Sequence, residues 1–297
     1  MTSVGFVGLG AMGGRMAGRL LAAGNFVYGT NRTRSKADPL VKRGLVWRDS
    51  PRELAENAEV VFSMVSDDLA LEAIAGGRDG ILAGLRPGSV YVDMSTVSPA
   101  GSRELAGLVH EHGAVMLEAP VSGSAHAAGE GGLAIMVGGD AAAFARVEPL
   151  LRQLGQTVTH VGGSGTALTM KLAIDISLAA QVIAFSEGVL LAERDGIDPE
   201  LAVEVLTSSA VASPMLRSRG SALLDRPDEA WLDIESMQKD VGRALGRARS
   251  LGVPLPSAAL ANELLAAARA LGHGNQDILA VFDVLEQLAG PGTSVAA

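Results

Sequence analysis

The sequence predicts an α/β protein with two domains: an N-terminal Rossmann domain built on a doubly wound parallel sheet, and a C-terminal all-α domain. Three observations predict this architecture. In the first half, short apolar runs alternate with helical patterns, as they do in parallel βαβ units. A glycine-rich turn follows the first of these runs. Strand patterns then end at a long apolar helix that links the two domains, and a length of 297 residues suits two domains.

Six apolar runs in the first half have the length of buried strands and are bounded by polar or glycine-rich positions. They occupy residues 5–7, 26–28, 60–62, 90–92, 115–117 and 134–137. Helical patterns lie between most of them, for example over residues 12–23 and 100–112. Because crossovers between parallel strands are right-handed, this order predicts an open, doubly wound sheet.

The second half begins with a run without proline over residues 167–195. As a helix this run would be about 40 Å long, which is enough to link two domains. Further helices are predicted over residues 199–208, 234–251, 257–271 and 277–288, and residues 290–297 are expected to fray. We therefore expect a Rossmann domain at residues 1–164 and a helical domain at residues 165–290.

The composition argues against several classes of protein. A formal net charge of −9 argues against nucleic-acid binding, and the absence of cysteine excludes disulfides and thiolate metal sites. The five histidines are scattered without metal-ligand spacing, so no metal is expected. The first residues lack the basic segment of a secretory signal, and no apolar stretch reaches the roughly 20 residues of a membrane span. We expect a soluble, cytoplasmic protein.

A glycine-rich turn lies between the first strand and the first helix, where Rossmann domains bind a dinucleotide. Gly8 permits the tight turn, Gly10 lets the backbone approach the pyrophosphate, and Gly13 lets helix and strand pack closely. The free N–H groups at the helix N-terminus would bind the pyrophosphate. An ordinary tight turn is the alternative interpretation. The predicted cofactor-binding turn reads Gly8, Leu9, Gly10, Ala11, Met12 and Gly13.

The end of the second predicted strand indicates which dinucleotide binds. NAD-binding domains place an acidic residue about 20 residues after the glycines, where it holds the ribose 2′-hydroxyl. This chain has Asn31, Arg32 and Thr33 there, followed by Arg34 and Lys36. The Arg32 guanidinium can bind a 2′-phosphate through two hydrogen bonds, with Asn31 and Thr33 completing the pocket. The segment favours NADP (NADPH) over NAD, and an ordinary solvated basic loop is the alternative.

Five motifs, in family order, resemble the β-hydroxyacid dehydrogenase family, which includes 3-hydroxyisobutyrate dehydrogenases and glyoxylate/succinic semialdehyde reductases and is related to imine reductases. The likeness covers nearly the whole chain. The motifs are the glycine turn at 8–13, Asp-Met-Ser-Thr at 93–96, Ala-Pro-Val-Ser-Gly at 119–123, the segment 165–171 and Lys-Asp at 239–240.

The resemblance implies roles for particular residues. Lys171 matches the catalytic lysine, and Ser122 and Gly123 match the segment that holds the substrate carboxylate. A lysine beside the reacting oxygen can transfer a proton and stabilise an alkoxide, although the residues alone equally allow a solvent-facing lysine here. Contact with the cofactor is implied for Met64, Val65, Thr96 and Lys239.

Asp175 departs from the family pattern, which usually has asparagine four residues after the catalytic lysine. Positions four apart share a helix face, so the Asp175 carboxylate can reach Lys171. There it would favour the ammonium form and could stabilise a cationic iminium, or it would simply replace the asparagine hydrogen bond. The turn before Lys171 is also longer than usual in the family, and Ser124 stands where a second glycine is common.

We expect an NADP-dependent oxidoreductase of a small hydroxy or oxo acid, with Lys171 and Asp175 as the catalytic residues and Lys171 as general acid/base. An imine reductase is the second hypothesis, and a non-catalytic dinucleotide sensor or chromatin reader built on the same fold is the third. The long helix is apolar on more than one face, so we also expect a homodimer with contacts through the helical domains.

Overall fold

The computed structural model describes residues 2–228 and 230–290. The chain divides into two compact units, Met1–Lys171 and Leu172–Ala297. The division lies inside one helix, α9 (Thr166–Arg194), whereas the predicted boundary preceded that helix. The tail that was expected to fray lies, beyond Gly290, outside the described residues.

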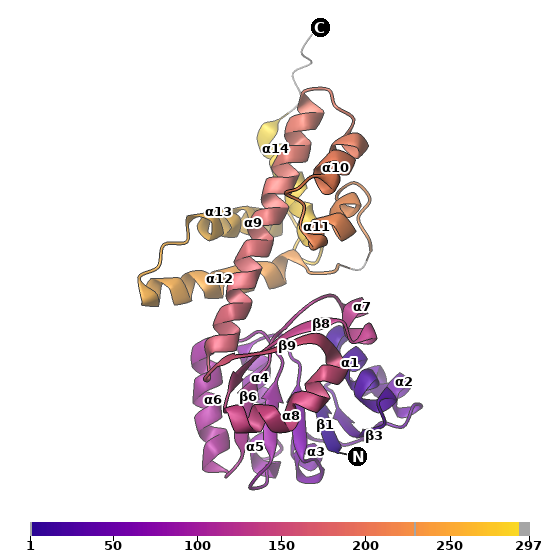
Figure 1. The fold of residues 1–297 in the computed structure, drawn as a ribbon, viewed down its shortest axis with the longest axis vertical. Helices are drawn as coiled ribbons and strands as arrows, with labels where there is room; N and C mark the ends of the chain where they lie inside the picture. Colours follow the sequence, from indigo (N-terminus) through magenta and orange to yellow (C-terminus); the bar gives the residue numbers. More distant parts are fainter. Residues whose placement is uncertain (1, 229, 291–297) are drawn as a thin grey trace. The chain divides into compact units, whose positions relative to one another are not determined.

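One sheet forms the centre of the first unit (Figure 1). Among the described residues it has nine strands in the order β3-β2-β1-β4-β5-β6-β8-β7, with β9 paired to β8. The strands are β1 (Ser3–Val7), β2 (Phe26–Thr30), β3 (Val46–Trp47), β4 (Val60–Ser63), β5 (Val90–Asp93), β6 (Val115–Glu118), β7 (Val121–Ser122), β8 (Leu133–Gly139) and β9 (Gly155–Gly162).

The sheet is parallel from β3 to β6 and mixed beyond that point. β8 runs antiparallel to both β6 and β7, and β9 runs parallel to β8. All six predicted strands are present, but β3, β7 and β9 were not predicted. β3 and β7 have only two residues each, which is too short for a periodic pattern. β9 exposes Gln156, Thr157 and Thr159, so it contains no continuous apolar run.

The carboxyl ends of the central strands line up in register at one edge of the sheet. Val7 of β1 is the register partner of Ser63 in β4, and Ser63 is the partner of Asp93 in β5. Asp93 is in turn the partner of Glu118 in β6. This edge is where ligands bind in open α/β sheets, so polar residues at these positions are candidates for a site.

Helices cover both faces of the sheet, which confirms the doubly wound prediction. One apolar cluster includes Met16 and Leu20 of α1 and Leu151 of α8, and a second includes Leu54 of α3 and Val109 of α6. The helices of this unit are α1 (Ala11–Ala22), α2 (Asp38–Val41), α3 (Pro51–Asn57), α4 (Asp68–Ala75), α5 (Ile81–Gly84), α6 (Pro99–Glu111), α7 (Ala125–Glu130) and α8 (Ala141–Leu154), with the 3₁₀ turn η1 (Arg34–Ala37).

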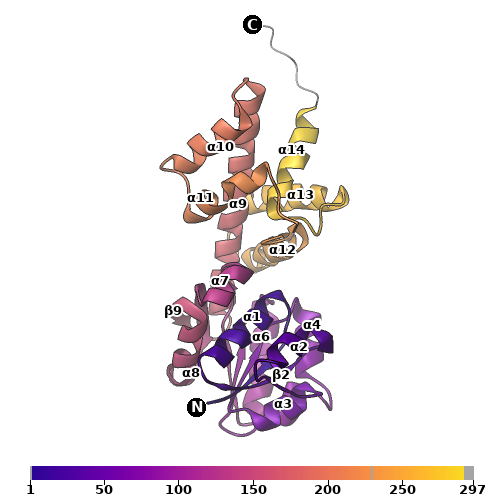
Figure 2. The ribbon, with the colours of Figure 1, turned by 90° about the vertical axis from the view of Figure 1, so that its right-hand side faces the viewer.

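The second unit is all-helical, as predicted. Helix α9 passes through it with α10 and α11 on one side and α12 to α14 on the other (Figures 1 and 2). Phe185 and Val189 of α9 share one buried apolar cluster with Met237, Leu265 and Phe282. Its remaining elements are α10 (Pro199–Ser208), α11 (Pro214–Arg219), η2 (Gly220–Leu223), α12 (Ile234–Leu251), α13 (Pro256–Ala270), η3 (Ile278–Ala280) and α14 (Val281–Ala289).

The helical predictions agree with this arrangement at most ends. α10 and α12 have the predicted bounds, because Pro199 begins one helix and a left-handed Gly252 ends the other. The predicted helix at 277–288 is instead a 3₁₀ turn followed by α14. The six-residue helix α11 was not predicted, since it is too short to show a helical period.

Helix α9 is unusually apolar. By length and composition it could cross a membrane, with a mean hydropathy of 1.6 over its most apolar window. The sequence reasoning found no such stretch, because it required a run without charges. A core helix of a soluble protein passes the same test, so this property alone is a weak indication of a membrane span.

Candidate active site

The glycine-rich turn has little free space at two of its three glycines. Gly8 has a φ of +91°, and a Cβ on it would lie 2.2 Å from the Met64 carbonyl oxygen. A Cβ on Gly13 would lie 2.0 Å from the Gly8 carbonyl oxygen. These two glycines are therefore required by the fold itself, the first for a left-handed turn and the second for close packing of α1 on β1.

Gly10 differs, because a Cβ placed on it would meet no protein atom within 4 Å. Its φ of −75° and ψ of −162° are also open to any residue. Gly10 is the N-cap of α1 and offers no side chain, so no side-chain cap occupies the first N–H groups of this helix. The open space and free amides fit a dinucleotide pyrophosphate, which a methyl group at Gly10 would displace.

Asn31 connects the glycine turn to the basic segment. Its Oδ1 accepts a hydrogen bond from the Leu9 amide at 3.0 Å, and its Nδ2 donates to the Thr33 carbonyl at 2.8 Å. The sequence predicted that the Asn31 side chain helps to form the phosphate pocket. Both of its polar groups have partners in the chain, and its clearest structural effect is to fix the two predicted cofactor-binding segments relative to each other.

Arg32 is the exposed cation that follows Asn31, and it makes no ion pair with any residue the structure describes. Arg34, by contrast, stacks over the Trp47 ring at 4.7 Å and lies 3.8 Å from the Asp49 carboxylate. The Arg32 guanidinium is therefore available to an anionic ligand at the end of β2.

A buried serine–aspartate network lies beside the segments that are predicted to contact the nicotinamide. Asp93 Oδ1 accepts hydrogen bonds from the hydroxyls of Ser63 at 2.6 Å and Ser95 at 2.7 Å. The Val65 amide donates to Ser95 Oγ at 2.9 Å. Sequence reasoning treated Asp93 only as part of a motif. The structure shows that Asp93 connects the segment after β4, which holds Met64, to the segment after β5, which holds Thr96.

Burial raises the pKa of Asp93 above its usual value, although the hydrogen bonds from Ser63 and Ser95 oppose this shift and the nearby Glu118 charge adds to it. Tyr91, which shares a 2.8 Å hydrogen bond with Ser63, is also fully buried. Burial and the charge of Asp93 raise the pKa of Tyr91, so its hydroxyl stays neutral. The network thus holds its acidic groups in a strongly desolvated environment.

The predicted substrate-anchoring residues lie just beyond β6. Ser122 ends β7 and is partly exposed, and Gly123 is exposed with a φ of +143°. This conformation favours glycine, and a Cβ on Gly123 would also lie 2.9 Å from the end of the Leu133 side chain, which would have to shift. Ser124, which departs from the family pattern, caps α7 by accepting a hydrogen bond from the Ala127 amide at 3.0 Å.

Lys171 lies near the start of α9 and is half-buried, and Asp175 follows one turn later with 1% exposure. Glu118, at the end of β6, accepts hydrogen bonds from the amides of Ala167 and Leu168 at the N-terminus of this helix. Sequence reasoning missed Glu118. The signal that could have found it is an acidic residue that ends an apolar strand, directly before the predicted anchor.

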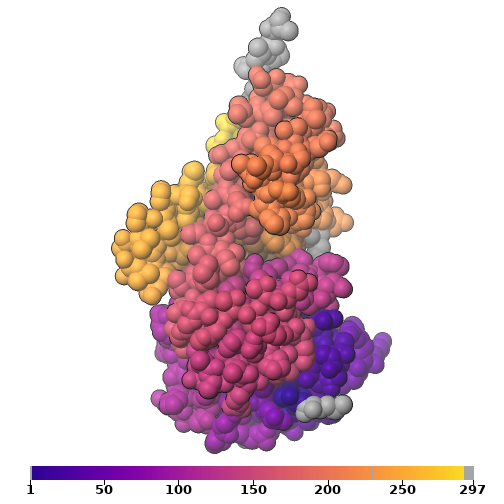
Figure 3. Space-filling view, viewed as in Figure 1, coloured from indigo at the N-terminus to yellow at the C-terminus, as the bar shows by residue number. Residues whose placement is uncertain are grey.

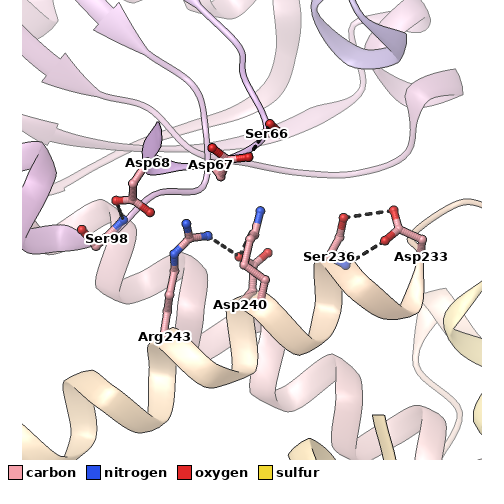
Figure 4. A network of polar contacts seen from close by, with 9 residues as sticks. Ser66, Asp67, Asp68, Ser98, Asp233, Ser236, Asp240 and Arg243 are labelled. Atoms are coloured by element: carbon pink, nitrogen blue, oxygen red, sulfur yellow. Dashed lines mark hydrogen bonds and ion pairs between the residues drawn. The ribbon is translucent and has the colours of Figure 1, made fainter. Parts of the chain in front are cut away.

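Lys239, the remaining predicted cofactor residue, lies on α12 in the second unit. Its Nζ is 3.7 Å from the carboxylate of Asp240, which also accepts a hydrogen bond from Arg243 at 3.1 Å (Figure 4). Asp233 caps the same helix through the amide and hydroxyl of Ser236. These contacts hold the polar side of α12, which includes the lysine.

Within the first unit, the loop after β4 has its own polar contacts (Figure 4). Asp67 caps α4 by accepting a hydrogen bond from the Ala70 amide at 2.8 Å, and Asp68 accepts one from the Ser98 amide at 2.8 Å. The Asp68 contact connects the loop after β4 to the loop after β5. In the described part of the chain, no group of three or more His, Asp or Glu residues is arranged to hold a metal ion.

Comparisons with known proteins show which family the chain resembles. Residues 3–162 match the NAD binding domain of 6-phosphogluconate dehydrogenase, and residues 163–285 match the NAD-binding domain of NADP-dependent 3-hydroxyisobutyrate dehydrogenase. The chain is 37% identical over 286 residues to 2-hydroxy-3-oxopropionate reductase of Escherichia coli, covering 96% of this chain and 98% of the relative. It is 36% identical to glyoxylate/succinic semialdehyde reductase 2 of Arabidopsis thaliana, covering 96% of this chain and 79% of the relative.

Solved structures show the same fold. The 3-hydroxyisobutyrate dehydrogenase of Salmonella typhimurium aligns with a TM-score of 0.87 at 29% identity, covering 96% of this chain and 100% of the other. Psf3, solved with NADP+ and 2-OPP, aligns with the same TM-score and identity over 95% and 100% of the two chains. An imine reductase of Myxococcus stipitatus in complex with NADP+ shares the fold at a TM-score of 0.64 and 21% identity, over 96% and 100% of the chains. The chain belongs to the β-hydroxyacid dehydrogenase family of NAD(P)-binding oxidoreductases, as its five motifs predicted.

Proposed function

We propose that this protein transfers hydride between NADP(H) and a small hydroxy or oxo acid, in the manner of a 3-hydroxyisobutyrate dehydrogenase. One observation carries the proposal. The end of β6, which leads into the predicted carboxylate anchor at Ser122 and Gly123, is bound through Glu118 to the first turn of the helix that carries Lys171. An anchor and an acid/base group held by one framework are what reduction of an oxo acid requires.

The preference for NADP rests on Arg32. The second strand ends at Thr30, and no acidic side chain follows at the position that would hold a ribose 2′-hydroxyl. Arg32 is exposed and not engaged in an ion pair in the described structure, so it is free to bind a 2′-phosphate. The segment at Met64, Val65 and Thr96 would contact the nicotinamide half, and Lys239 would contact the cofactor from the helical unit.

Lys171 would act as the general acid in reduction and the general base in oxidation. A bound nicotinamide supplies or accepts the hydride. The ammonium group of Lys171 would donate a proton to the carbonyl oxygen as negative charge develops there, and its positive charge would stabilise that oxygen. Ser122 and the Gly123 amide would hold the substrate carboxylate, which orients the carbonyl.

An imine reductase is the second candidate, and Asp175 is the observation that favours it. This carboxyl group is 1% exposed and lies one turn after Lys171 on α9. A buried negative charge near the reacting centre would stabilise a cationic iminium better than a neutral carbonyl. Lys171 and the Ser122–Gly123 segment favour the oxo-acid reaction, because a cyclic imine without a carboxylate needs no such anchor.

Initial rates of NADPH oxidation by the purified protein would separate the two candidates. The substrates are glyoxylate, succinic semialdehyde and 2-hydroxy-3-oxopropionate, with a cyclic imine measured alongside. We expect turnover of at least one oxo acid and at most slow turnover of the imine. Asp175→Asn is the matched variant: it should retain oxo-acid reduction, whereas an imine reductase would lose activity. Turnover of the imine alone would refute the oxo-acid assignment.

We further propose that the protein is a cytoplasmic homodimer that pairs through its helical unit, acts on a small-molecule substrate, and binds neither nucleic acid nor a membrane. Leu191 of α9, Leu201 and Val205 of α10, and Val211 are large apolar side chains exposed on this unit. The segments α10 and α11 lie on the face seen in orange in Figure 3. A second copy of the same surface would bury these side chains, and light scattering would give the mass of two chains.

A further inference from the structure

Glu118 is a buried carboxylate whose hydrogen bonds all go to the chain itself. It is 2% exposed. Its Oε1 accepts hydrogen bonds from the amides of Ala167 at 2.8 Å and Leu168 at 3.3 Å, and its Oε2 accepts one from the Ser102 hydroxyl at 3.0 Å. Among the described residues no lysine or arginine pairs with it. Its charge is therefore stabilised by the N-terminus of α9, where partial positive charge gathers on free amides.

The fold makes specific room for this side chain. A Cβ on Gly138 of β8 would lie 2.5 Å from Glu118 Oε1, so only glycine at that position leaves space for the carboxylate. Ser102 on α6 is itself buried, with 2% exposure. Three separate elements, β8, α6 and α9, thus meet around one carboxyl group. A residue needed only to start a helix could do so from an exposed N-cap position, as Asp140 and Asp198 do elsewhere in this chain.

The position of Glu118 relates it to the proposed reaction. It is the last residue of β6, four residues before Ser122, and the Ala119 amide that follows it donates to the Asp93 carbonyl at 2.7 Å. At its other side it holds Ala167, which lies four residues, or one helical turn, before Lys171. One carboxylate therefore connects the strand that leads to the anchor with the turn that precedes the lysine.

We propose that Glu118 is a positioning residue that sets where the Lys171 amine stands relative to the substrate anchor at Ser122 and Gly123. This inference rests on the proposed function, because it gives Lys171 the acid/base role. Glu118 touches neither substrate nor cofactor in this scheme. It acts by fixing the first turn of α9, since a displacement of about 1 Å in a reacting group can cost roughly a hundredfold in rate.

Three substitutions test the geometry. Glu118→Asp keeps the charge but withdraws the carboxylate by one methylene group, so it cannot reach both Ala167 and Ser102 without movement of α9. Glu118→Gln keeps the length: its carbonyl oxygen can accept from the two amides while its NH₂ donates to Ser102 Oγ. Ser102→Ala is the matched control, because it removes the third hydrogen bond of Glu118 and leaves its two bonds to the first turn of α9 in place.

We expect Glu118→Asp to lower kcat by about ten- to a hundredfold, with the Kd for NADPH within about twofold of wild type because the glycine turn is untouched. Glu118→Gln and Ser102→Ala should stay within about threefold of the wild-type kcat. Thermal unfolding would establish that each variant is folded. Equal kcat values for wild type and Glu118→Asp would overturn the inference, as would an equal loss in Glu118→Asp and Glu118→Gln.

A double-mutant cycle with Lys171→Ala separates positioning from a general structural effect. If Glu118 acts through Lys171, Glu118→Asp should not slow the residual reaction of Lys171→Ala further. The same fold-loss in both backgrounds would mean that Glu118 only supports the fold, and the inference would be wrong while the proposed function stands. If Lys171→Ala alone keeps the wild-type kcat, the proposed function fails and the role of Glu118 fails with it.

Discussion

Gly10→Ala should separate cofactor binding from folding, because the three glycines of the turn have different surroundings. A Cβ on Gly10 meets no protein atom within 4 Å, and the backbone there is extended. The folded protein should lose only about 0.5–1 kcal/mol, the usual difference between glycine and alanine at an N-cap. The new methyl group would occupy space at the helix N-terminus that the pyrophosphate needs.

We therefore expect Gly10→Ala to weaken NADPH binding at least tenfold, which corresponds to about 1.4 kcal/mol or more of binding free energy. Gly13→Ala should fail differently. Its Cβ would stand 2.0 Å from the Gly8 carbonyl oxygen, so α1 must move away from β1 at a cost of about 3 kcal/mol or more. Gly14→Ala is the control, since its Cβ would lie an ordinary 3.4 Å from the Leu9 carbonyl oxygen.

Fluorescence titration with NADPH and urea unfolding of the three variants would make the comparison. Gly14→Ala should bind NADPH as wild type does and unfold at equal or higher urea, because alanine favours a helix by up to about 1 kcal/mol over glycine. Two results would refute the reasoning: Gly10→Ala that binds NADPH with wild-type affinity, or Gly10→Ala that is destabilised as strongly as Gly13→Ala.

Three further predictions concern charge and assembly. Arg32→Ala should weaken NADPH binding by tenfold or more and leave NADH binding within about twofold, because only NADPH carries the 2′-phosphate; an equal effect on both cofactors would contradict the assignment. Because the pKa of Asp93 is raised in the folded protein, protonation of this carboxyl favours folding. That contribution to stability is lost as pH rises through the raised pKa. Urea unfolding should accordingly show Asp93→Asn gaining stability relative to wild type as the pH rises above about 4, the usual pKa of an aspartate, whereas a constant difference would argue against the shift. Replacing Leu201 and Val205 together by glutamate should give a light-scattering mass of one chain; a mass of two chains would exclude this surface from the dimer.

The parts of the fold that the sequence predicts are those with local signals. Apolar runs located the six central strands, and the glycine turn located the start of α1, because Gly8 and Gly13 are fixed by contacts within a few residues of β1 and by the adjacent β4. Strands without a period of their own were missed. β9 forms because β8 offers it a free edge, and that depends on the rest of the sheet.

The supporting residues of the site could not be predicted in the same way. Glu118 and its partner Ala167 are 49 positions apart, and Asn31 reaches the Leu9 amide across 22 positions. Sequence motifs gave Asn31 a role at the phosphate pocket, where its type fits, but could not show that its side chain already bonds to the glycine turn. An acidic residue at the end of a buried strand is visible in the sequence, whereas the amides that donate hydrogen bonds to its carboxylate are brought to it only by tertiary packing.

The most direct test of the proposed reaction is the kcat of Lys171→Ala for the oxo acid that the wild-type protein reduces fastest with NADPH. The variant should fold normally and bind NADPH with unchanged affinity, because the glycine turn and Arg32 are intact. Loss of a general acid predicts a kcat lower by about a hundredfold or more. A kcat within a few-fold of wild type would contradict the account, since Lys171 would then neither donate the proton nor stabilise the developing charge.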